Sequence, residues 1–187
     1  MTIRESILHI YPLPEASLLL LTELLEPVQL RKGHILLQAD KVEKEVYFIE
    51  KGIVRAYAER EDSDITFWFG QEGDIVISMR SYVDQQAGYE SIELLEDCNL
   101  YRVHSHTLQQ LFETDIAIAN WGRRFAEKEL IKTEERLISR QFRTATERYQ
   151  ELMQHQPGLL QRVSLGHIAS YLGITQVSLS RIRADIR

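Results

Sequence analysis

The sequence contains a single cysteine, Cys98, among its 187 residues. One thiol cannot form an internal disulfide, and it cannot supply the ligands of an iron–sulfur cluster or a four-thiolate metal site. Long apolar runs are also missing, because the leucine run at residues 18–21 is short and has acidic residues on both sides. A membrane span needs about 20 apolar residues, and a signal peptide needs a different flanking pattern. We therefore expect a cytoplasmic protein with no membrane partner.

Signatures of catalysis are equally scarce. The sequence has no glycine-rich nucleotide-binding loop, no His-Glu-x-x-His metal motif and no nucleophile elbow. Each of these motifs fixes reactive groups at a characteristic spacing, so their absence argues against the corresponding enzymes. We expect a protein that is not an enzyme and that has no metal site.

Charge is distributed unevenly along the chain, although the net charge is only −6. Residues 1–138 carry 15 basic and 25 acidic side chains, a net charge of −10. Residues 139–187 carry seven arginines and three acids, a net charge of +4. A basic segment on an acidic body is typical of a nucleic-acid-binding module joined to another domain. The alternative is a chance clustering of a few arginines.

Hydrophobic periodicity divides the chain into two helical regions around a region of short strands. Residues 3–25 have the leucine spacing of a helix, with Pro14 in a first turn. From about residue 28 to 103, short apolar segments recur every 8–12 residues, with turns at residues 50–52 and 73–74. This spacing favours an antiparallel sandwich over a parallel sheet. The predicted fold class is α+β with two domains: an antiparallel β jelly roll with flanking helices, a long helix, and a C-terminal helix-turn-helix.

Residues 114–139 are predicted to form one long helix, and a further helix is expected at about residues 141–154. Six residues of the long helix recur at spacings of four and three, which is a coiled-coil-like seam and indicates pairing with a second copy of the chain. The seam consists of Ala119, Arg123, Ala126, Leu130, Thr133 and Leu137. The neighbouring face, which carries Ile118, Trp121 and Phe125, is expected to pack on the sheet. The alternative is that both faces belong to one intramolecular core.

The segment from residue 164 to residue 183 carries the most information. Ser164 can cap a helix, Gly173 can end that helix and turn the chain, and Thr175 can cap a second helix. The apolar residues expected to be buried are Leu165, Ile168, Ala169, Leu172, Ile174, Leu179 and Ile182. This order of capping, turning and apolar residues is the pattern of a helix-turn-helix. An ordinary helical hairpin is the alternative.

The outer face of the second helix is predicted to enter the major groove of DNA. A rotation of about 100° per residue places Val177, Ser180 and Arg181 opposite the buried side chains. Arg181 can donate two hydrogen bonds to a guanine edge, and Gln176 can pair with an adenine. The predicted DNA-binding set is Ser164, Thr175, Gln176, Val177, Ser178, Ser180, Arg181 and Arg183. The arginines better suited to phosphates are Arg162, Arg183 and Arg187.

These features together resemble the Crp/Fnr family of transcription regulators, whose members join a cyclic-nucleotide-binding-type jelly roll to a winged helix-turn-helix. The resemblance covers essentially the whole chain, and it is most specific at residues 168–173 (Ile-Ala-Ser-Tyr-Leu-Gly) and 178–182 (Ser-Leu-Ser-Arg-Ile). It implies a homodimer on a near-palindromic operator, with RNA polymerase as a further partner. The usual operator is not implied, because Gln176-Val177 stands where the family commonly has Arg-Glu or Val-Glu. The terminal wing is expected to be reduced or missing, because the sequence ends soon after the second helix.

The resemblance places a phosphate-binding cassette at residues 72–93, but the residues at its key positions differ from those of the family. The family's Gly-Glu pair falls on Ile77-Ser78, and its phosphate-binding arginine falls on Glu90. A buried phosphate needs a bidentate cation, and Glu90 would repel it. We therefore do not expect cyclic AMP or cyclic GMP as the effector, and the roll holds another small ligand or none. The residues expected to line it, unless they are ordinary core and rim, are Trp68, Ser78, Met79, Arg80, Tyr82, Tyr89, Glu90 and Ser91.

No resident cofactor is expected. The family's iron–sulfur branch needs several cysteines, and His104 and His106 read as a surface pair and not as haem ligands. We predict an effector domain at residues 1–113, a dimerisation helix at 114–139 and a DNA-binding domain at 140–187. The predicted function is a ligand-responsive, DNA-binding transcription regulator. The alternative is a small-ligand-binding or protein-interaction module whose helix-turn-helix no longer binds DNA, which the acidic body and Val177 favour.

Overall fold

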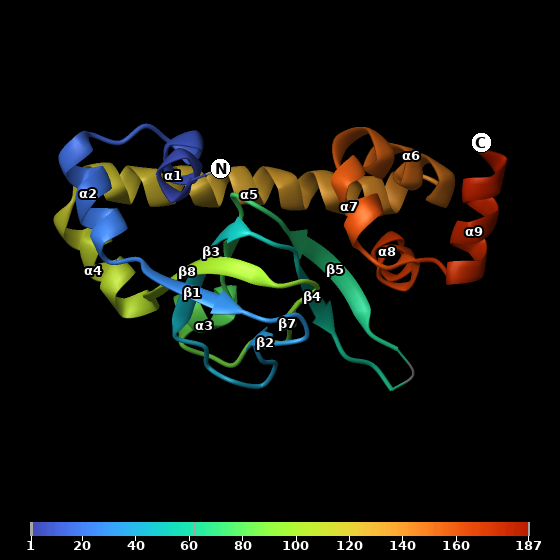
Figure 1. Ribbon diagram of the computed structural model, residues 1–187, viewed down its shortest axis with the longest axis horizontal. Coiled ribbons are helices and arrows are strands. Elements are labelled where there is room, and N and C mark those ends of the chain that lie inside the picture. Colours follow the sequence, from blue (N-terminus) through green and yellow to red (C-terminus); the bar gives the residue numbers. More distant parts are fainter. Residues whose placement is uncertain (1, 62, 187) are drawn as a thin grey trace.

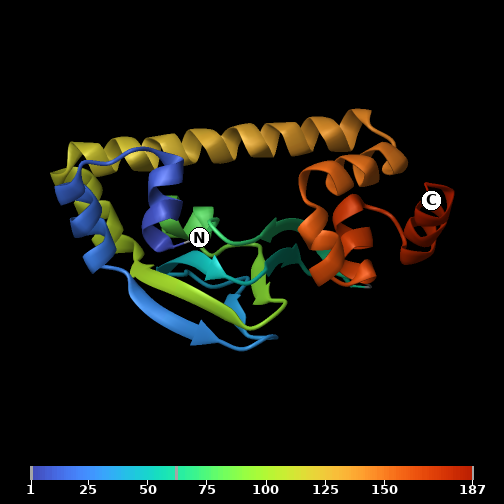
Figure 2. The ribbon, with the colours of Figure 1, turned by 45° about the horizontal axis from the view of Figure 1, so that its top comes forward.

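A single long helix, α5 (Ile116–Phe142), runs along most of the molecule in the computed structural model shown in Figure 1, and α9 lies beyond its end. The structure describes residues 2–61 and 63–186. The N-terminal helices and most of the strands lie along one end of α5, and the C-terminal helices gather at its other end (Figure 2). The remaining helices are α1 (Ile3–Ile10), α2 (Glu15–Glu23), α3 (Met79–Asp84), α4 (Ser105–Thr114), α6 (Ala145–His155), α7 (Pro157–Arg162), α8 (Leu165–Leu172) and α9 (Gln176–Asp185).

The described strands form two four-stranded sheets in which neighbouring strands are antiparallel. The first sheet has the order β1 (Glu26–Leu30), β8 (Cys98–His104), β3 (Glu45–Lys51) and β6 (Ile75–Val76). The second sheet has the order β2 (Ile35–Leu37), β7 (Ser91–Leu94), β4 (Val54–Ala58) and β5 (Ile65–Gly70). The two-domain α+β fold with an antiparallel roll, a long helix and C-terminal helices is therefore confirmed.

One local expectation needs correction. The helical region predicted over residues 3–25 is two helices, because Pro12 and Pro14 interrupt the chain between α1 and α2 and proline cannot donate a helix hydrogen bond. The turn expected at residues 50–52 is present, although β3 continues to Lys51, and it joins β3 to β4, which belong to different sheets. Gly52 makes this turn possible: its φ is +122°, and an added Cβ would lie 2.2 Å from the sulfur of Cys98.

The long helix begins at Ile116 and ends at Phe142, whereas residues 114–139 were expected from the sequence. Asp115 determines where it starts: one carboxylate oxygen accepts hydrogen bonds from the backbone N–H groups of Ala117 and Ile118, at 2.8 and 3.0 Å. The other oxygen accepts a hydrogen bond from the hydroxyl of Ser17 at 2.7 Å. The cap therefore fastens α2 to the start of α5.

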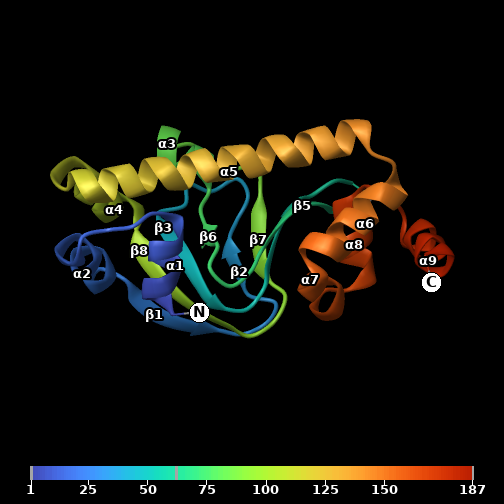
Figure 3. The same cartoon turned by 90° about the horizontal axis from the view of Figure 1, so that it is seen from above.

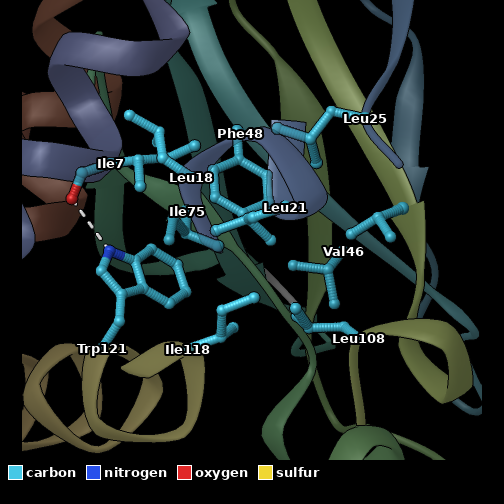
Figure 4. Packing of buried hydrophobic residues seen from close by; sticks show 11 residues of the cluster. Ile7, Leu18, Leu21, Leu25, Val46, Phe48, Ile75, Leu108, Ile118 and Trp121 are labelled. Carbon is cyan, nitrogen blue, oxygen red and sulfur yellow. Dashed lines mark hydrogen bonds between the residues drawn. The ribbon is translucent and has the colours of Figure 1, made fainter. Parts of the chain in front are cut away.

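Trp121 contributes a fully buried side chain to the first apolar core, which fills the space between the first sheet and helices α1, α2, α4 and α5 (Figure 4). Its indole N–H donates to the carbonyl of Ile7 at 2.8 Å, and its ring lies 6.2 Å from the rings of Phe48 and Phe125. Burying a large side chain of this kind stabilises a fold by about 1.5–3 kcal/mol. The expected packing of Ile118, Trp121 and Phe125 against the sheet side is confirmed.

Two further apolar cores follow along the molecule. The second lies between the two sheets and includes Cys98, whose thiol pKa is raised to about 11 by burial. The third joins Ile53, from the turn before β4, and Phe69, from β5, to the C-terminal helices. Figure 3 shows the strand β5 reaching toward these helices. In the described part of the chain, no helix combines the length and apolar character that crossing a membrane requires.

Candidate nucleic-acid interface and ligand cassette

Helices α8 and α9 have the local geometry predicted for a helix-turn-helix. Ser164 caps α8 by accepting a hydrogen bond from the backbone of His167 at 3.3 Å. Gly173 ends α8 in the left-handed conformation with φ +69°, which a residue with a side chain adopts only at a cost. Thr175 caps α9 by accepting a hydrogen bond from the backbone of Ser178 at 3.1 Å. All three assignments are confirmed.

The inner faces of the two helices are apolar, as the spacing indicated. The fully buried residues are Ile168, Ala169, Leu172 and Leu179. Leu165, Ile174 and Ile182 are half-buried and pack against the same core. This core extends to α6 and α7 and packs the inner face of α9 against α8, so the outer face of α9 is turned toward solvent.

The outer face of α9 is exposed and carries a cation. Val177 is 62% exposed, and Ser180 and Arg181 are exposed beside it. Among the ion pairs of residues 2–61 and 63–186, none involves Arg181. A guanidinium that makes no ion pair keeps its donors available for a base edge or a phosphate.

Gln176 and Ser164, which are also predicted to contact DNA, lie close to each other beside this face. The side-chain oxygen of Gln176 and the hydroxyl of Ser164 lie 3.7 and 4.0 Å from the position a Cβ would take on Gly166. The starts of α8 and α9 therefore form one surface with donors and acceptors from both helices. Other hydroxyls are engaged within α9: Ser180 donates to the carbonyl of Gln176 at 3.0 Å, and Ser178 bonds Thr175 at 2.9 Å.

The three arginines predicted to contact phosphates lie in different surroundings. Arg183 is half-buried on α9, and Arg187 lies outside the described residues. The expectation for Arg162 is not met, because its guanidinium bonds two carboxylates of the strand region. It donates to Glu72 at 2.7 and 3.0 Å and also to Glu96. This pairing lowers the pKa of Glu72 to about 2.

A contact that the sequence did not indicate holds α8 on the second sheet. The hydroxyl of Ser170 accepts a hydrogen bond from the backbone N–H of Thr66 at 2.9 Å and donates to the carbonyl of Asp64 at 2.8 Å. The ring of Tyr171 lies 5.1 Å from that of Phe69. β5 is an edge strand, so Ser170 satisfies peptide groups that would otherwise face solvent.

The structure brings together only part of the predicted effector site. Ser78 and Glu90 are buried and face each other across Gly88. Ser91 is buried too, but its hydroxyl accepts a hydrogen bond from the backbone of Ala39 at 3.1 Å. Glu90 accepts one hydrogen bond, from the backbone N–H of Tyr89 at 3.0 Å.

The other residues predicted for this site point elsewhere. Met79, Arg80 and Tyr89 are exposed, and Arg80 donates to Gln86 at 2.9 Å. The side chain of Tyr82 packs against the first core, where burial raises its pKa, and Trp68 packs against the second core. Within residues 2–61 and 63–186, no three His, Cys, Asp or Glu side chains gather as a metal site would require.

The neighbouring pair Gly73-Asp74 has a structural role. Gly73 has φ +94°, and Asp74 closes the turn by accepting a hydrogen bond from the backbone of Gln71 at 3.0 Å. The carboxylate lies 3.5 Å from the amine of Lys132 on α5. The pKa of Asp74 is raised because burial disfavours the charged carboxylate. This turn ties the start of β6 to the long helix.

The predicted seam on α5 is solvent-exposed along most of its length in the single chain. Leu130 is 69% exposed and Leu137 is 57% exposed, while Arg123, Ala126 and Thr133 are exposed and Ala119 is half-buried. Further apolar residues near the C-terminal end of the same helix, which were not part of the predicted seam, are exposed as well: Ile131, Ile138 and Phe142. Their signal was present as a seven-residue repeat, since 131 and 138 follow 130 and 137.

Comparison with known proteins identifies the domain and the fold. Residues 27–115 match the family model described as the cyclic nucleotide-binding domain. FixK2 from Bradyrhizobium japonicum has a similar structure, with a TM-score of 0.72, 20% identity, and coverage of 87% of this chain and 84% of that one. The c-di-GMP responsive regulator CLP of Xanthomonas campestris also has a TM-score of 0.72, with 16% identity over 92% of this chain and 91% of that one.

The catabolite activator protein of Thermus thermophilus has a TM-score of 0.60 and 15% identity, and the similarity covers 97% of this chain and 86% of that one. No match by sequence was found among curated proteins. The chain therefore contains a cyclic nucleotide-binding-type domain and has the fold of Crp/Fnr regulators, as its motifs indicated.

Proposed function

We propose that this protein is a ligand-responsive transcription regulator that binds DNA as a homodimer through α9. The observation that carries the proposal is Arg181, which is exposed on the outer face of a capped helix-turn-helix and makes no ion pair with any residue that the structure describes. A helix presented in this way fits the major groove, where an arginine reads guanine through two hydrogen bonds. Val177 offers the methyl group of thymine an apolar contact, and Gln176 offers an adenine a donor and an acceptor.

The charge distribution supports DNA as the partner. Seven of the chain's arginines lie in residues 139–187, on an otherwise acidic protein. Phosphate contacts of this kind release counterions and make the affinity dependent on salt concentration. The acidic remainder of the chain repels DNA, so contact is confined to the helix-turn-helix end of the molecule.

The exposed apolar face of α5 supports pairing with a second copy. Leu130, Leu137 and Phe142 are each more than half exposed, and Phe142 reaches 79%. Apolar residues on one helix at seven-residue intervals pair with the same surface of another helix in a two-fold arrangement. Such a dimer carries two copies of α9, which together read a near-palindromic operator.

Ligand response is proposed from the domain at residues 27–115 and from its connection to the helix-turn-helix. The sheet that contains β7, next to the cassette, also contains β5, which holds Ser170 of α8. A structural change at the cassette can therefore be transmitted to the helix-turn-helix through neighbouring strands and the hydrogen bond of Ser170. Coupling between two such sites is typically worth about 1–3 kcal/mol.

The proposal is tested by fluorescence anisotropy with labelled duplexes that cover the promoter of this protein's own gene and its neighbours. The expected result is binding to at least one duplex that is tighter than binding to a random duplex and that weakens as salt rises. Binding equal to that of the random duplex across all segments would favour a ligand-binding or protein-interaction module instead. Sedimentation analysis of the same samples reports whether the bound species is a dimer.

A further inference from the structure

An exposed arginine in the last turn of α5 lies beside the turn of the helix-turn-helix. The guanidinium of Arg140 lies 3.2 Å from the position that a Cβ would take on Gly173, the residue that ends α8. Thr175, two residues further along the chain, caps α9. The side chain of Arg140 therefore belongs to the long helix but ends next to the turn that leads into α9.

A second arginine holds this arrangement in place. Arg148, on α6, donates to the carbonyl of Leu172 at 2.8 Å and to the carbonyl of Arg143 at 2.6 Å. The first carbonyl ends α8, and the second follows directly after α5. Arg148 thus joins the ends of the two helices and is half-buried, whereas Arg140 is exposed and can reach a ligand.

The positive charge of Arg140 is not balanced by an ion pair within the described part of the chain. Helices α6 to α9 contain three acids, and none of them pairs with it. Glu151 pairs with Arg143 at 3.2 Å, and Glu147 is engaged in the capping box of α6. The third acid, Asp185, lies at the far end of α9. The surface beside the turn therefore has a net positive charge.

We infer that Arg140 binds a phosphate of the DNA backbone at the rim of the groove that α9 enters. The N-terminal end of a recognition helix contacts the bases, so the turn that precedes it faces the edge of the major groove, where the phosphates lie. A guanidinium binds phosphate oxygens through two parallel hydrogen bonds. The inference rests on the proposed function and adds to it a DNA contact from outside the helix-turn-helix.

This contact replaces one that the structure removes. Arg162 was expected at a phosphate, but it pairs with Glu72 and Glu96 of the strand region. Arg140 has the charge and the exposure that Arg162 lacks for this role. It also extends the DNA-binding surface onto α5, the helix through which two copies are proposed to pair.

A purely structural role for Arg140 makes a different prediction. An arginine in the last turn of a helix interacts favourably with the helix dipole, and this interaction affects stability alone. A phosphate contact instead releases counterions, so it appears in the slope of the logarithm of the binding constant against the logarithm of the salt concentration. The slope therefore separates the two roles.

The test measures this slope by fluorescence anisotropy of the full-length protein, with the best promoter duplex and with a random duplex. Arg140→Ala is expected to weaken binding to both duplexes by the same factor, about threefold to tenfold at low salt, and to reduce the slope by about 0.9 per bound protomer. Arg140→Lys keeps the charge and should keep the wild-type slope. The control is Arg4→Ala, which removes one positive charge from α1, where Arg4 pairs with Glu15 at 2.8 Å, and should change neither quantity.

An unchanged slope for Arg140→Ala would overturn the inference, even if its melting temperature falls. Weakening confined to the promoter duplex would also overturn it, because a phosphate contact carries no sequence information. Failure of the proposed function looks different. A wild type that binds both duplexes equally would contradict the regulator, while its salt slope still tests Arg140. A wild type that binds neither duplex would contradict both.

Discussion

The hydroxyl of Ser170, in the first helix of the helix-turn-helix, accepts a hydrogen bond at 2.9 Å from the backbone N–H of Thr66, on the edge strand of the second sheet. The two residues are 104 positions apart in the sequence. Because the same hydroxyl donates to the carbonyl of Asp64, one side chain satisfies two peptide groups of the strand region. The helix-turn-helix is therefore joined to the second sheet by directional bonds as well as by apolar packing.

Removing this hydroxyl should loosen the contact. Ser170→Ala is expected to destabilise the contact by about 1 kcal/mol, because two backbone groups lose their partner. Hydrogen exchange at the amide of Thr66 should then accelerate by about fivefold, while the amides of the central strand β4 should not change. Ser180→Ala, on α9, is the control. Unchanged exchange at Thr66 would show that the bond does not protect the edge strand.

A second contact between the strand region and the C-terminal helices, the ion pair of Glu72 with Arg162, is sensitive to acid. The folded-state pKa of Glu72 is lowered from 4.5 to about 2, first by its hydrogen bonds with Arg162. A carboxyl with a lowered folded pKa contributes stability that is present above its unfolded pKa and lost as the pH falls through the folded pKa. The contribution is therefore full above about pH 4.5 and disappears between about pH 4.5 and pH 2.

Glu72→Gln should lower the free energy of unfolding at neutral pH by about 1–2 kcal/mol, allowing for solvent screening of the pair. The difference from wild type should shrink as urea denaturation is repeated at lower pH. Glu26→Gln removes a far more exposed partner of Arg102 and should cause no measurable change. A Glu72→Gln deficit that stays constant down to acid pH would contradict this account of the pKa.

Gly173 should be intolerant of any side chain. Its φ of +69° is strained for alanine, and an added Cβ would lie 3.2 Å from the guanidinium of Arg140. Gly173→Ala is expected to lower the free energy of unfolding by about 1–2 kcal/mol in urea denaturation. Gly158→Ala is the matched control, since Gly158 lies in α7 with nothing within 4 Å and should be neutral or stabilising. Equal effects of the two substitutions would refute the argument from φ.

The exposed face of α5 predicts how the protein self-associates. A charge at position 130 would face its own symmetry mate in a paired helix, so Leu130→Glu should shift sedimentation from dimer to monomer and weaken self-association by at least about 100-fold. Leu19→Glu places the same charge on another exposed leucine, on α2, and should leave the dimer intact. A wild type that sediments as a monomer would contradict the proposed dimer directly.

The sequence predicted features that depend on near neighbours along the chain. Ser164, Gly173 and Thr175 each act on residues within a few positions, so capping and turn rules were sufficient to predict the helix-turn-helix. The same rules identified the turn at Gly73-Asp74. The long helix was recognised from its period, and only its ends were misplaced, by two residues at the start, where Asp115 is the cap, and by three residues at the end.

The features that were missed depend on contacts between distant segments. Arg162 was expected at phosphates, but it meets Glu96 from 66 positions away and Glu72 from 90. No local pattern indicates such a pairing. Similarly, the turn at Gly52 was predicted, but its role in joining the two sheets depends on strand pairings that no local pattern shows. The placement of Ser78 and Glu90 around Gly88 also depends on how the chain folds back after α3.

The most direct test of the central claim compares Arg181→Ala with Arg102→Ala in DNA binding. Both substitutions remove one positive charge, but Arg102 lies on β8 and pairs with Glu26. For each protein, anisotropy gives the affinity for the best promoter duplex and for a random duplex. We predict that Arg181→Ala loses about 1–3 kcal/mol of discrimination between the two, roughly 5- to 150-fold, while Arg102→Ala keeps the wild-type ratio. An Arg181→Ala ratio equal to that of wild type would show that α9 does not read the bases.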